Sequence, residues 1–155
     1  WWEATFPHEG SRIDKSNFQP VYFRNRIRKR LFGILEKYNP NIKETLANMA
    51  ENVSIDYDYI YGQSQKAFNN ISAKNKKSSV SLILAKLLKL HPALQNMVLR
   101  LAFESLKGDT RRLTYQHTKE LRDLIYLRPE RSIVDLPFNI SAVKNQRYIR
   151  IYKSR

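Results

Sequence analysis

The sequence contains no cysteine, and this absence removes several classes of protein at once. A chain without cysteine has no disulfide scaffold, no zinc–thiolate site and no cysteine nucleophile. It also fits a reducing compartment, where disulfides rarely persist. We therefore expect a cytoplasmic protein.

Long apolar runs and phosphate-binding loops are missing as well. No stretch offers the roughly 20 apolar residues that a membrane-spanning helix needs, and residues 1–18 are polar, charged or aromatic, unlike a signal peptide. The four glycines are isolated, so no Gly-rich loop is present to cradle a phosphate. The three histidines (His8, His91 and His117) lack metal-binding spacing, and we predict no metal site.

The chain opens on two tryptophans, and its first methionine is Met49. Because translation begins at methionine, we expect this chain to be a piece of a longer protein. Its 155 residues leave room for one or two small domains with a real core.

Acidic residues are scarce beside basic ones. The chain has 28 Lys and Arg against 14 Asp and Glu, which gives a net charge of +14. Residues 1–110 carry 17 basic and 10 acidic side chains, and residues 111–155 carry 11 and 4, so each part contributes +7. Charge spread over the whole chain favours a polyanionic partner, and nucleic acid is a better candidate than a membrane surface.

Apolar residues recur at helical spacing through the first half of the chain. Residues 23–38 keep their apolar side chains within one arc, and the helix should end at Asn39, because a residue before proline is pushed out of the helical region. A second helix should follow, with Asn41 as its N-cap and Glu44 as the capping-box partner. Its apolar face continues over residues 42–68, about seven turns.

The second half of the chain begins after the polar residues 69–79, which we take as a boundary. The periodicity predicts three more helices, over residues 80–90, 92–107 and 114–127, with Pro92 in a first turn and Gly108–Asp109 as a stop. Three short strands should follow, at residues 132–136, 140–144 and 148–152.

These patterns predict a mainly α protein: a helical body with a long helix, followed by a small α+β subdomain that ends in a short antiparallel sheet. We divide the chain into an irregular lead-in (1–20), a helical linker or substrate-side domain (21–72) and a C-terminal subdomain (80–155).

Residues 14–31, DKSNFQPVYFRNRIRKRL, hold the densest positive charge. Three of the cations fall outside the apolar arc, as on a solvated helix face: Arg26, Lys29 and Arg30. Arg24 falls inside that arc, and an unpaired buried charge is very costly, so Arg24 needs a partner. Two readings stay open: Arg24 pairs with Asp14 and supports the loop, or it faces a phosphate-bearing ligand or a second domain.

The same stretch resembles the tRNA(Ile)-lysidine synthase family, in which a D-x-S-N turn leads into an R-N-x-[IL]-R helix that ends near N-P. The matching segments here are residues 14–17, 22–28 and 39–42. The segment LHPALQ through Leu99–Arg100 is similar to the family's LP-x-x-L-Q-R-R-x-L-R, although Asn96 and Met97 stand where the family often has two arginines. Residues 113–121 and 134–137 are similar to the helix and small sheet that come next, so the resemblance spans residues 13–153.

The resemblance implies a role in an ATP-dependent ligase. Such an enzyme adenylates C2 of the wobble cytidine in the CAU anticodon of an isoleucine tRNA, and free lysine then displaces AMP to give lysidine. ATP with Mg would be bound mainly by an N-terminal domain whose S-G-G-x-D-S loop has no counterpart in this chain. The chain alone is therefore expected to be inactive. The implied partners are tRNA and free lysine, with no membrane, and a homodimer is left open.

Roles for individual residues also follow from the resemblance. It implies that Arg24, Asn25 and Asp14 are catalytic. It implies that Ser16, Asn17 and Arg28 face ATP or the substrate. In the C-terminal subdomain, which would dock the tRNA, we select three basic residues as tRNA contacts: Arg111, Arg112 and Arg147.

Two readings compete with this one. A stand-alone basic helical module that binds RNA or DNA without catalysis would need only the positive surface. A scaffold that pairs through its long helix is disfavoured by the charge of +14. An S-G-G-x-D-S loop encoded upstream of Trp1 would decide between these proteins and the ligase.

We predict that Arg24→Ala in the complete enzyme reduces lysidine formation far more than tRNA affinity. A positioned cation near developing phosphate charge acts chiefly in the transition state. Single-turnover lysidine synthesis and thermal melting measure the two effects, with Arg26→Ala and Lys29→Ala as controls on the opposite helix face. If Arg24→Ala only lowers the melting temperature, Arg24 is a structural partner of Asp14.

Overall fold

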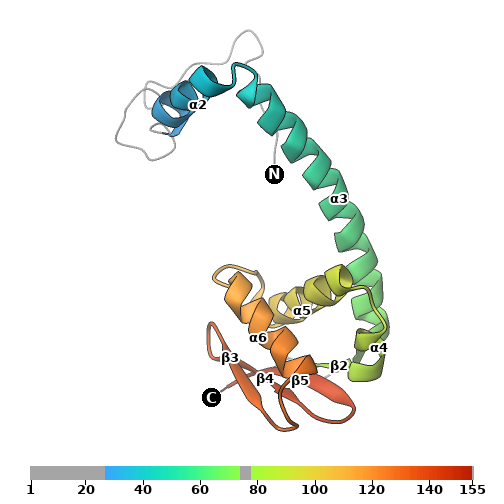
Figure 1. Cartoon of the computed structure of the whole chain (residues 1–155). Coiled ribbons are helices and arrows are strands. Elements are labelled where there is room, and N and C mark those ends of the chain that lie inside the picture. Colours follow the sequence, from blue (N-terminus) through green and yellow to red (C-terminus); the bar gives the residue numbers. More distant parts are fainter. Residues whose placement is uncertain (1–26, 74–77, 155) are drawn as a thin grey trace. The chain divides into compact units, whose positions relative to one another are not determined.

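A computed structural model describes residues 27–73 and 78–154 of the chain (Figure 1). Five of the residues to which we assigned catalytic or substrate-facing roles lie outside these ranges: Asp14, Ser16, Asn17, Arg24 and Asn25. The lead-in over residues 1–20 lies outside them too. By its internal contacts the chain forms two compact units, Trp1–Val53 and Ser54–Arg155, and each is described by itself.

The first unit contains a short helical segment with a wide first turn. A π-helix, η2 (Ile27–Leu31), runs directly into α2 (Phe32–Tyr38). The helix ends at Asn39, whose backbone is extended (φ −143°, ψ 103°) as the following proline requires. This stop was predicted correctly. The backbone N–H of Asn41 donates to Oδ1 of Asn39 at 3.0 Å, and Lys43 pairs with Glu36 at 2.6 Å across the turn.

The long helix α3 covers Ile42–Ile71, so the prediction of one long helix was correct. Most of its apolar stripe is exposed to solvent, including Met49 (61% exposed) and Val53 (54%). Burial begins near its C-terminal end, where Ser64 and Ile71 are buried and Phe68 packs against the core of the second unit. The apolar periodicity therefore marked the helix but not a buried face.

The second unit is built on a five-stranded antiparallel sheet, in which the strands follow the order β1-β2-β5-β4-β3. The strands are β1 (Ser72–Ala73), β2 (Ser79–Ile83), β3 (Ile133–Leu136), β4 (Ile140–Lys144) and β5 (Tyr148–Lys153). The three predicted C-terminal strands are confirmed to within a residue at each end. The first two strands were not predicted.

The helix predicted over residues 80–90 was wrong. Its first half is strand β2, and only α4 (Leu84–Leu88) is helical. The sequence S-V-S-L alternates polar and apolar residues, and Val80 and Leu82 lie opposite Ile151 and Ile149 of β5. Pairing along a whole strand outweighs the modest helix propensity of this segment.

Two helices complete the second unit: α5 (Pro92–Lys107) and α6 (Tyr115–Tyr126). Both agree with the prediction, and so does the stop at Gly108, which has the left-handed conformation (φ 96°) that glycine adopts easily. At the start of α5, His91 caps the helix, because its Nδ1 accepts the N–H of Ala93 at 3.3 Å. None of the helices in the described ranges is long and apolar enough to cross a membrane.

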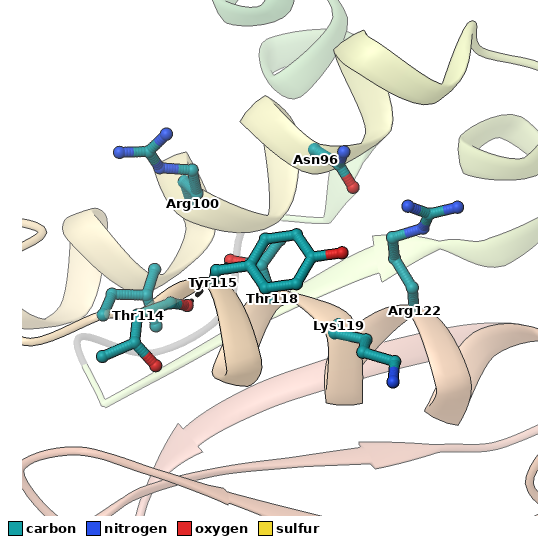
Figure 2. A pocket seen from close by; sticks show the side chains of 8 residues that line it. Asn96, Arg100, Thr114, Tyr115, Thr118, Lys119 and Arg122 are labelled. Carbon is teal, nitrogen blue, oxygen red and sulfur yellow. Dashed lines mark hydrogen bonds between the residues drawn. The ribbon is translucent and has the colours of Figure 1, made fainter.

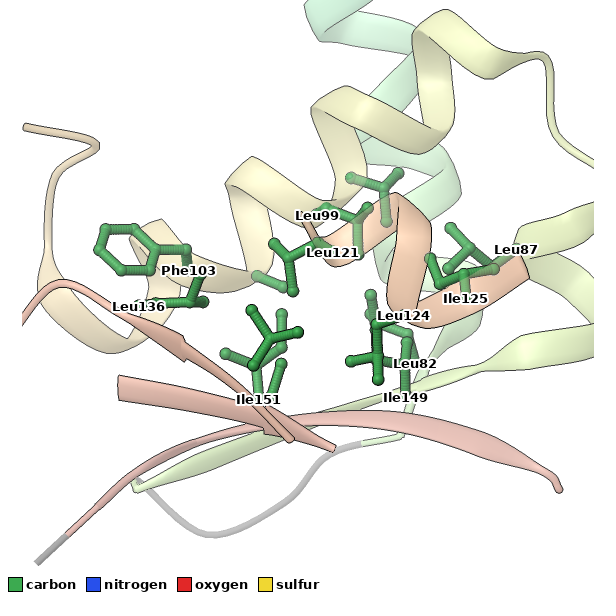
Figure 3. Close-up of a cluster of buried hydrophobic side chains, with 14 of the residues drawn as sticks. Leu82, Leu87, Leu99, Phe103, Leu121, Leu124, Ile125, Leu136, Ile149 and Ile151 are labelled. Atoms are coloured by element: carbon green, nitrogen blue, oxygen red, sulfur yellow. The ribbon is translucent and has the colours of Figure 1, made fainter. Parts of the chain in front are cut away.

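The core lies between the sheet and these two helices (Figure 3). Alternation along β5 turns Ile149 and Ile151 toward the helices, while Arg150 between them points to the opposite face. The buried side chains of the core are Ile71, Leu82, Leu87, Val98, Leu99, Ala102, Phe103, Leu106, Leu121, Leu124, Ile125, Val134, Leu136, Ile140, Ala142, Ile149 and Ile151. The sheet and both helices therefore stabilise one another through a single core.

Two polar contacts fix the C-terminal end of α6. The hydroxyl of Tyr126 donates to Oε1 of Gln95 on α5 at 2.7 Å, and Nε2 of the buried Gln95 donates to the carbonyl of Leu90 at 2.9 Å. Nζ of Lys144 on β4 donates to the carbonyls of Ile125, at 3.2 Å, and Arg128. A lysine at a helix C-terminus also stabilises the negative end of the helix dipole.

We predict that Leu124→Ala lowers the free energy of unfolding by about 2–5 kcal/mol, because Leu124 is fully buried in the core. Leu127→Ala is the matched control, since Leu127 directly follows α6 and is 77% exposed. Urea unfolding followed by circular dichroism measures both. Equal losses for the two variants would contradict the placement of α6.

Candidate nucleic-acid interface

A hollow of about 290 Å³ opens between α5 and α6 (Figure 2). We refer to it as the α5–α6 pocket. It is lined by Asn96 and Arg100 from α5, and by Leu113, Thr114, Tyr115, Thr118, Lys119 and Arg122 from the start and outer face of α6. Polar and basic side chains therefore dominate its wall.

Helical spacing explains why these residues share one pocket. Asn96 and Arg100 are four residues apart and lie one turn above the other on α5. Tyr115, Thr118 and Arg122 follow the same rule on α6. The inner faces of both helices are apolar and packed on the sheet, so the pocket occupies the groove beside the core.

The pocket carries three positive charges that lack acidic partners. Within residues 27–73 and 78–154, the ion pairs are Lys43 with Glu36 and Lys107 with Asp109. Arg100, Lys119 and Arg122 therefore have no carboxylate within 4.0 Å in this part of the chain. Figure 2 shows the side chains of Arg100 and Arg122 rising from the two different helices. Side chains of this kind attract phosphate groups, and arginine can bind them through two parallel hydrogen bonds.

One acceptor in the pocket has no hydrogen-bond donor among the described residues. Oδ1 of Asn96 is buried and accepts no hydrogen bond from them, and Figure 2 shows its side chain directed toward α6. The neighbouring residue, Met97, is 8% exposed and belongs to the apolar side of α5. Of the two positions where the resembled family often has arginine, only Asn96 therefore lines the pocket.

The start of α6 is held by a reciprocal cap. Oγ1 of Thr114 accepts the N–H of His117 at 3.4 Å, and Nδ1 of His117 accepts the N–H of Thr114 at 3.0 Å. His117 thus has a structural role at the start of this helix. The cap fixes the backbone from which Tyr115, 81% exposed, projects along the pocket.

The loop between α5 and α6 displays further cations. Asp109 accepts the backbone N–H of Arg111 at 2.7 Å and pairs with Lys107. Nζ of Lys107 also lies 3.9 Å from the ring centre of Phe138, with Cζ of Arg112 5.6 Å from the same ring. These cation–π contacts hold the loop against the turn between β3 and β4. Arg112 itself has a positive φ of 64° and is exposed.

The basic residues selected from the sequence fall into two places. Arg111 and Arg112 lie together in this loop, directly before the residues that line the pocket. Arg147 is exposed in the turn between β4 and β5, where its carbonyl accepts the N–H of Leu84 at 2.9 Å. That turn is at the opposite end of β4 from Phe138, about 20 Å away along the strand. The side chain of Arg28 is not among those described.

The sequence reasoning missed the pocket itself. Asn96, Arg100, Tyr115, Lys119 and Arg122 were not selected, although their spacing of three, four and seven residues was visible. That signal places side chains on one helix face but does not say which faces of two helices meet. For metals, the described residues contain no group of three His, Asp or Glu that could hold an ion.

Comparison with known proteins points to one family. Residues 82–137 match the family model of the TilS substrate binding domain. The chain is 30% identical over 130 residues to the tRNA(Ile)-lysidine synthase of Clostridioides difficile, covering 83% of this chain and 28% of the relative. Identity to the tRNA(Ile)-lysidine synthase of Caldanaerobacter subterraneus is 29% over 145 residues, covering 93% and 31%. The chain therefore spans less than a third of these relatives, and the matched segment contains the whole α5–α6 pocket.

We predict that Lys107→Met raises the pKa of Asp109. The hydrogen bond from Lys107 is the largest cause that lowers this pKa below its ordinary value of 3.8, followed by the N–H of Arg111. A lowered folded-state pKa stabilises the fold above the ordinary value, and that contribution is lost as pH falls through the folded-state pKa. The amide NMR shift of Arg111, titrated in acid, reports the midpoint. Lys66→Met is the control, and an unchanged midpoint in Lys107→Met would contradict the assignment.

Proposed function

The chain belongs to the tRNA(Ile)-lysidine synthase family, and from that premise we propose that its α5–α6 pocket and the adjoining loop dock tRNA. The observation that carries the proposal is the set of three unpaired cations, Arg100, Lys119 and Arg122, beside an exposed aromatic ring in a segment that matches a substrate binding domain. None of the described residues that line this pocket is anionic.

The charge of the second unit supports a phosphate-rich partner. Residues 80–154 contain 14 Lys and Arg against 6 Asp and Glu. Contacts from such residues to phosphates supply most of the affinity for nucleic acid and set its position, while contacts to bases supply specificity. Arg111 and Arg112 extend the positive surface beyond the pocket, and Arg147 would contact the same tRNA only if the interface reaches across the sheet.

The parent protein is proposed to ligate lysine to C2 of the wobble cytidine in the CAU anticodon of an isoleucine tRNA, with ATP. The described residues do not fit ATP and Mg, because they contain neither a Gly-rich phosphate loop nor a group of acidic metal ligands. We therefore propose that ATP and Mg bind to a part of the parent protein outside this chain. Arg24, Asn25, Asp14, Ser16, Asn17 and Arg28 remain proposed active-site residues on the strength of the resemblance alone.

We predict that tRNA binds this chain with a steep salt dependence. The logarithm of the binding constant should fall linearly with the logarithm of salt concentration, with a slope of about 0.7–0.9 for each phosphate contacted. Arg100→Gln and Arg122→Gln should each weaken binding at every salt concentration and reduce that slope by about one contact. Fluorescence anisotropy with labelled tRNA(Ile) measures the constants.

The matched control is Lys66→Gln, which removes the same charge from the exposed surface of α3 and should leave the slope unchanged. Arg111→Glu should weaken binding without lowering the melting temperature. Arg112→Glu should also weaken binding, with a small loss of melting temperature because it removes the contact with Phe138. Arg147→Glu tests whether the interface extends to the far turn. A flat salt response, or no binding at low salt, would refute the proposed function. If Lys66→Gln and Arg100→Gln weaken tRNA binding equally, the binding is a nonspecific attraction by net charge and does not depend on the pocket.

A further inference from the structure

We propose that the α5–α6 pocket takes one unpaired nucleotide of the bound tRNA, with its base against Tyr115 and a hydrogen-bond donor on Asn96. This inference rests on the proposed function and deepens it: the pocket would recognise a nucleotide in addition to attracting phosphates. The geometry that carries it is the combination of cations, an exposed ring and an unpaired buried acceptor in one hollow.

The acceptor is the second feature of the pocket, beside the cations. A buried carbonyl oxygen without a hydrogen bond is costly. Oδ1 of Asn96 is such an atom, and phosphate oxygens are also acceptors, so they cannot satisfy it. A group with an N–H or O–H donor would satisfy it. Nucleotides offer both features, since each carries a phosphate together with a ribose 2′-hydroxyl and a base edge with N–H donors.

The aromatic ring supplies a surface for the base. Tyr115 is 81% exposed, lines the pocket, and sits on a backbone that the Thr114–His117 cap holds in place. Stacking of a base on an aromatic side chain stabilises a complex with single-stranded RNA, and a ring on a fixed backbone loses less entropy on binding. An exposed tyrosine of this kind has no function in the core, because its ring contributes little to folding.

The size of the pocket favours a single nucleotide. Its volume of about 290 Å³ is near the lower limit of about 300–1,000 Å³ for sites that take small molecules. A duplex presents its bases stacked and paired, and side chains reach them poorly in RNA, whereas unpaired nucleotides can leave the stack and enter such a site. The three cations stand where the phosphates on either side of that nucleotide would pass.

The experiment uses the full chain with three probes: single-stranded RNA oligonucleotides of each base, the matching 2′-deoxy oligonucleotides, and a blunt RNA duplex. Asn96→Leu removes the acceptor and Tyr115→Ala removes the ring, while Tyr115→Phe keeps it. We expect each of the first two variants to weaken single-stranded RNA binding about tenfold and duplex binding much less. Their salt slopes should remain that of the unchanged chain, in contrast to Arg100→Gln.

Stability separates a binding role from a structural one. Because Oδ1 of Asn96 has no hydrogen-bond partner within residues 27–73 and 78–154, Asn96→Leu should leave the melting temperature unchanged or raise it. A lowered melting temperature with unchanged RNA binding would make Asn96 a structural residue and overturn the inference. If the effect of Asn96→Leu disappears with the 2′-deoxy probes, the donor is the 2′-hydroxyl. If the effect persists with the deoxy probes and depends on the base, the donor is a base edge.

The two proposals fail in different ways. If Asn96→Leu and Tyr115→Ala bind every probe as the unchanged chain does, while tRNA binding keeps its salt dependence, the pocket contacts phosphates only and this inference falls alone. If no RNA binds at low salt, the proposed function falls with it. Equal losses for duplex and single strand would also overturn the inference, since they would show a general effect on the surface.

Discussion

Pairing between β2 and β5 brings together two segments that lie far apart in the sequence. Ser79 is opposite Tyr152, and Ile83 is opposite Tyr148, so the pair closes a loop that contains α4, α5, α6 and two further strands. Closing so long a loop costs entropy, although the cost grows only slowly with length. The apolar side chains that both strands turn toward the helices offset this cost. Without this pairing, α5 and α6 would not pack on the same sheet, and the α5–α6 pocket would not form.

Both α5 and α6 pack apolar side chains into the core from one face and line the α5–α6 pocket with side chains from another face. On α6, Leu121 and Leu124 are fully buried, whereas Lys119 and Arg122, within three residues of them, are exposed. Concentrating unpaired cations on the outer faces destabilises the free protein through repulsion. A polyanion relieves that repulsion when it binds. The same apolar core that defines the fold therefore holds the charges where a nucleic acid can use them.

Local chemistry made much of this fold predictable from sequence. The stops at Asn39 and Gly108 and the start at Thr114 depend on backbone preferences of single residues, which do not need tertiary information. Strand β2 was missed because its identity depends on a partner about 70 residues away along the chain. For the same reason the α5–α6 pocket could not be predicted. Helical spacing shows which side chains share a face of each helix, but which two faces lie next to each other depends on how both helices pack on the sheet. Arg111 and Arg112 could be selected from sequence because a charged loop needs no such information, and their contact with tRNA stays a prediction. The roles of residues 14–28 still rest on resemblance.

The two ends of α6 differ in their hydrogen bonds to other elements, so one end would move further than the other if the helix tilted. Among the described residues, the hydrogen bonds that join α6 to other elements, from Tyr126 to Gln95 and from Lys144 to Ile125, are at its C-terminal end. At the other end, the hydrogen bonds of the cap between Thr114 and His117 stay within the same segment, and the preceding residues Leu113 and Arg112 contact the core and Phe138. Twelve residues at about 1.5 Å each make an arm of about 18 Å. A tilt of about 5° around the C-terminal end would therefore shift Tyr115 by about 1.6 Å, whereas the buried Leu124, close to that end, would move far less.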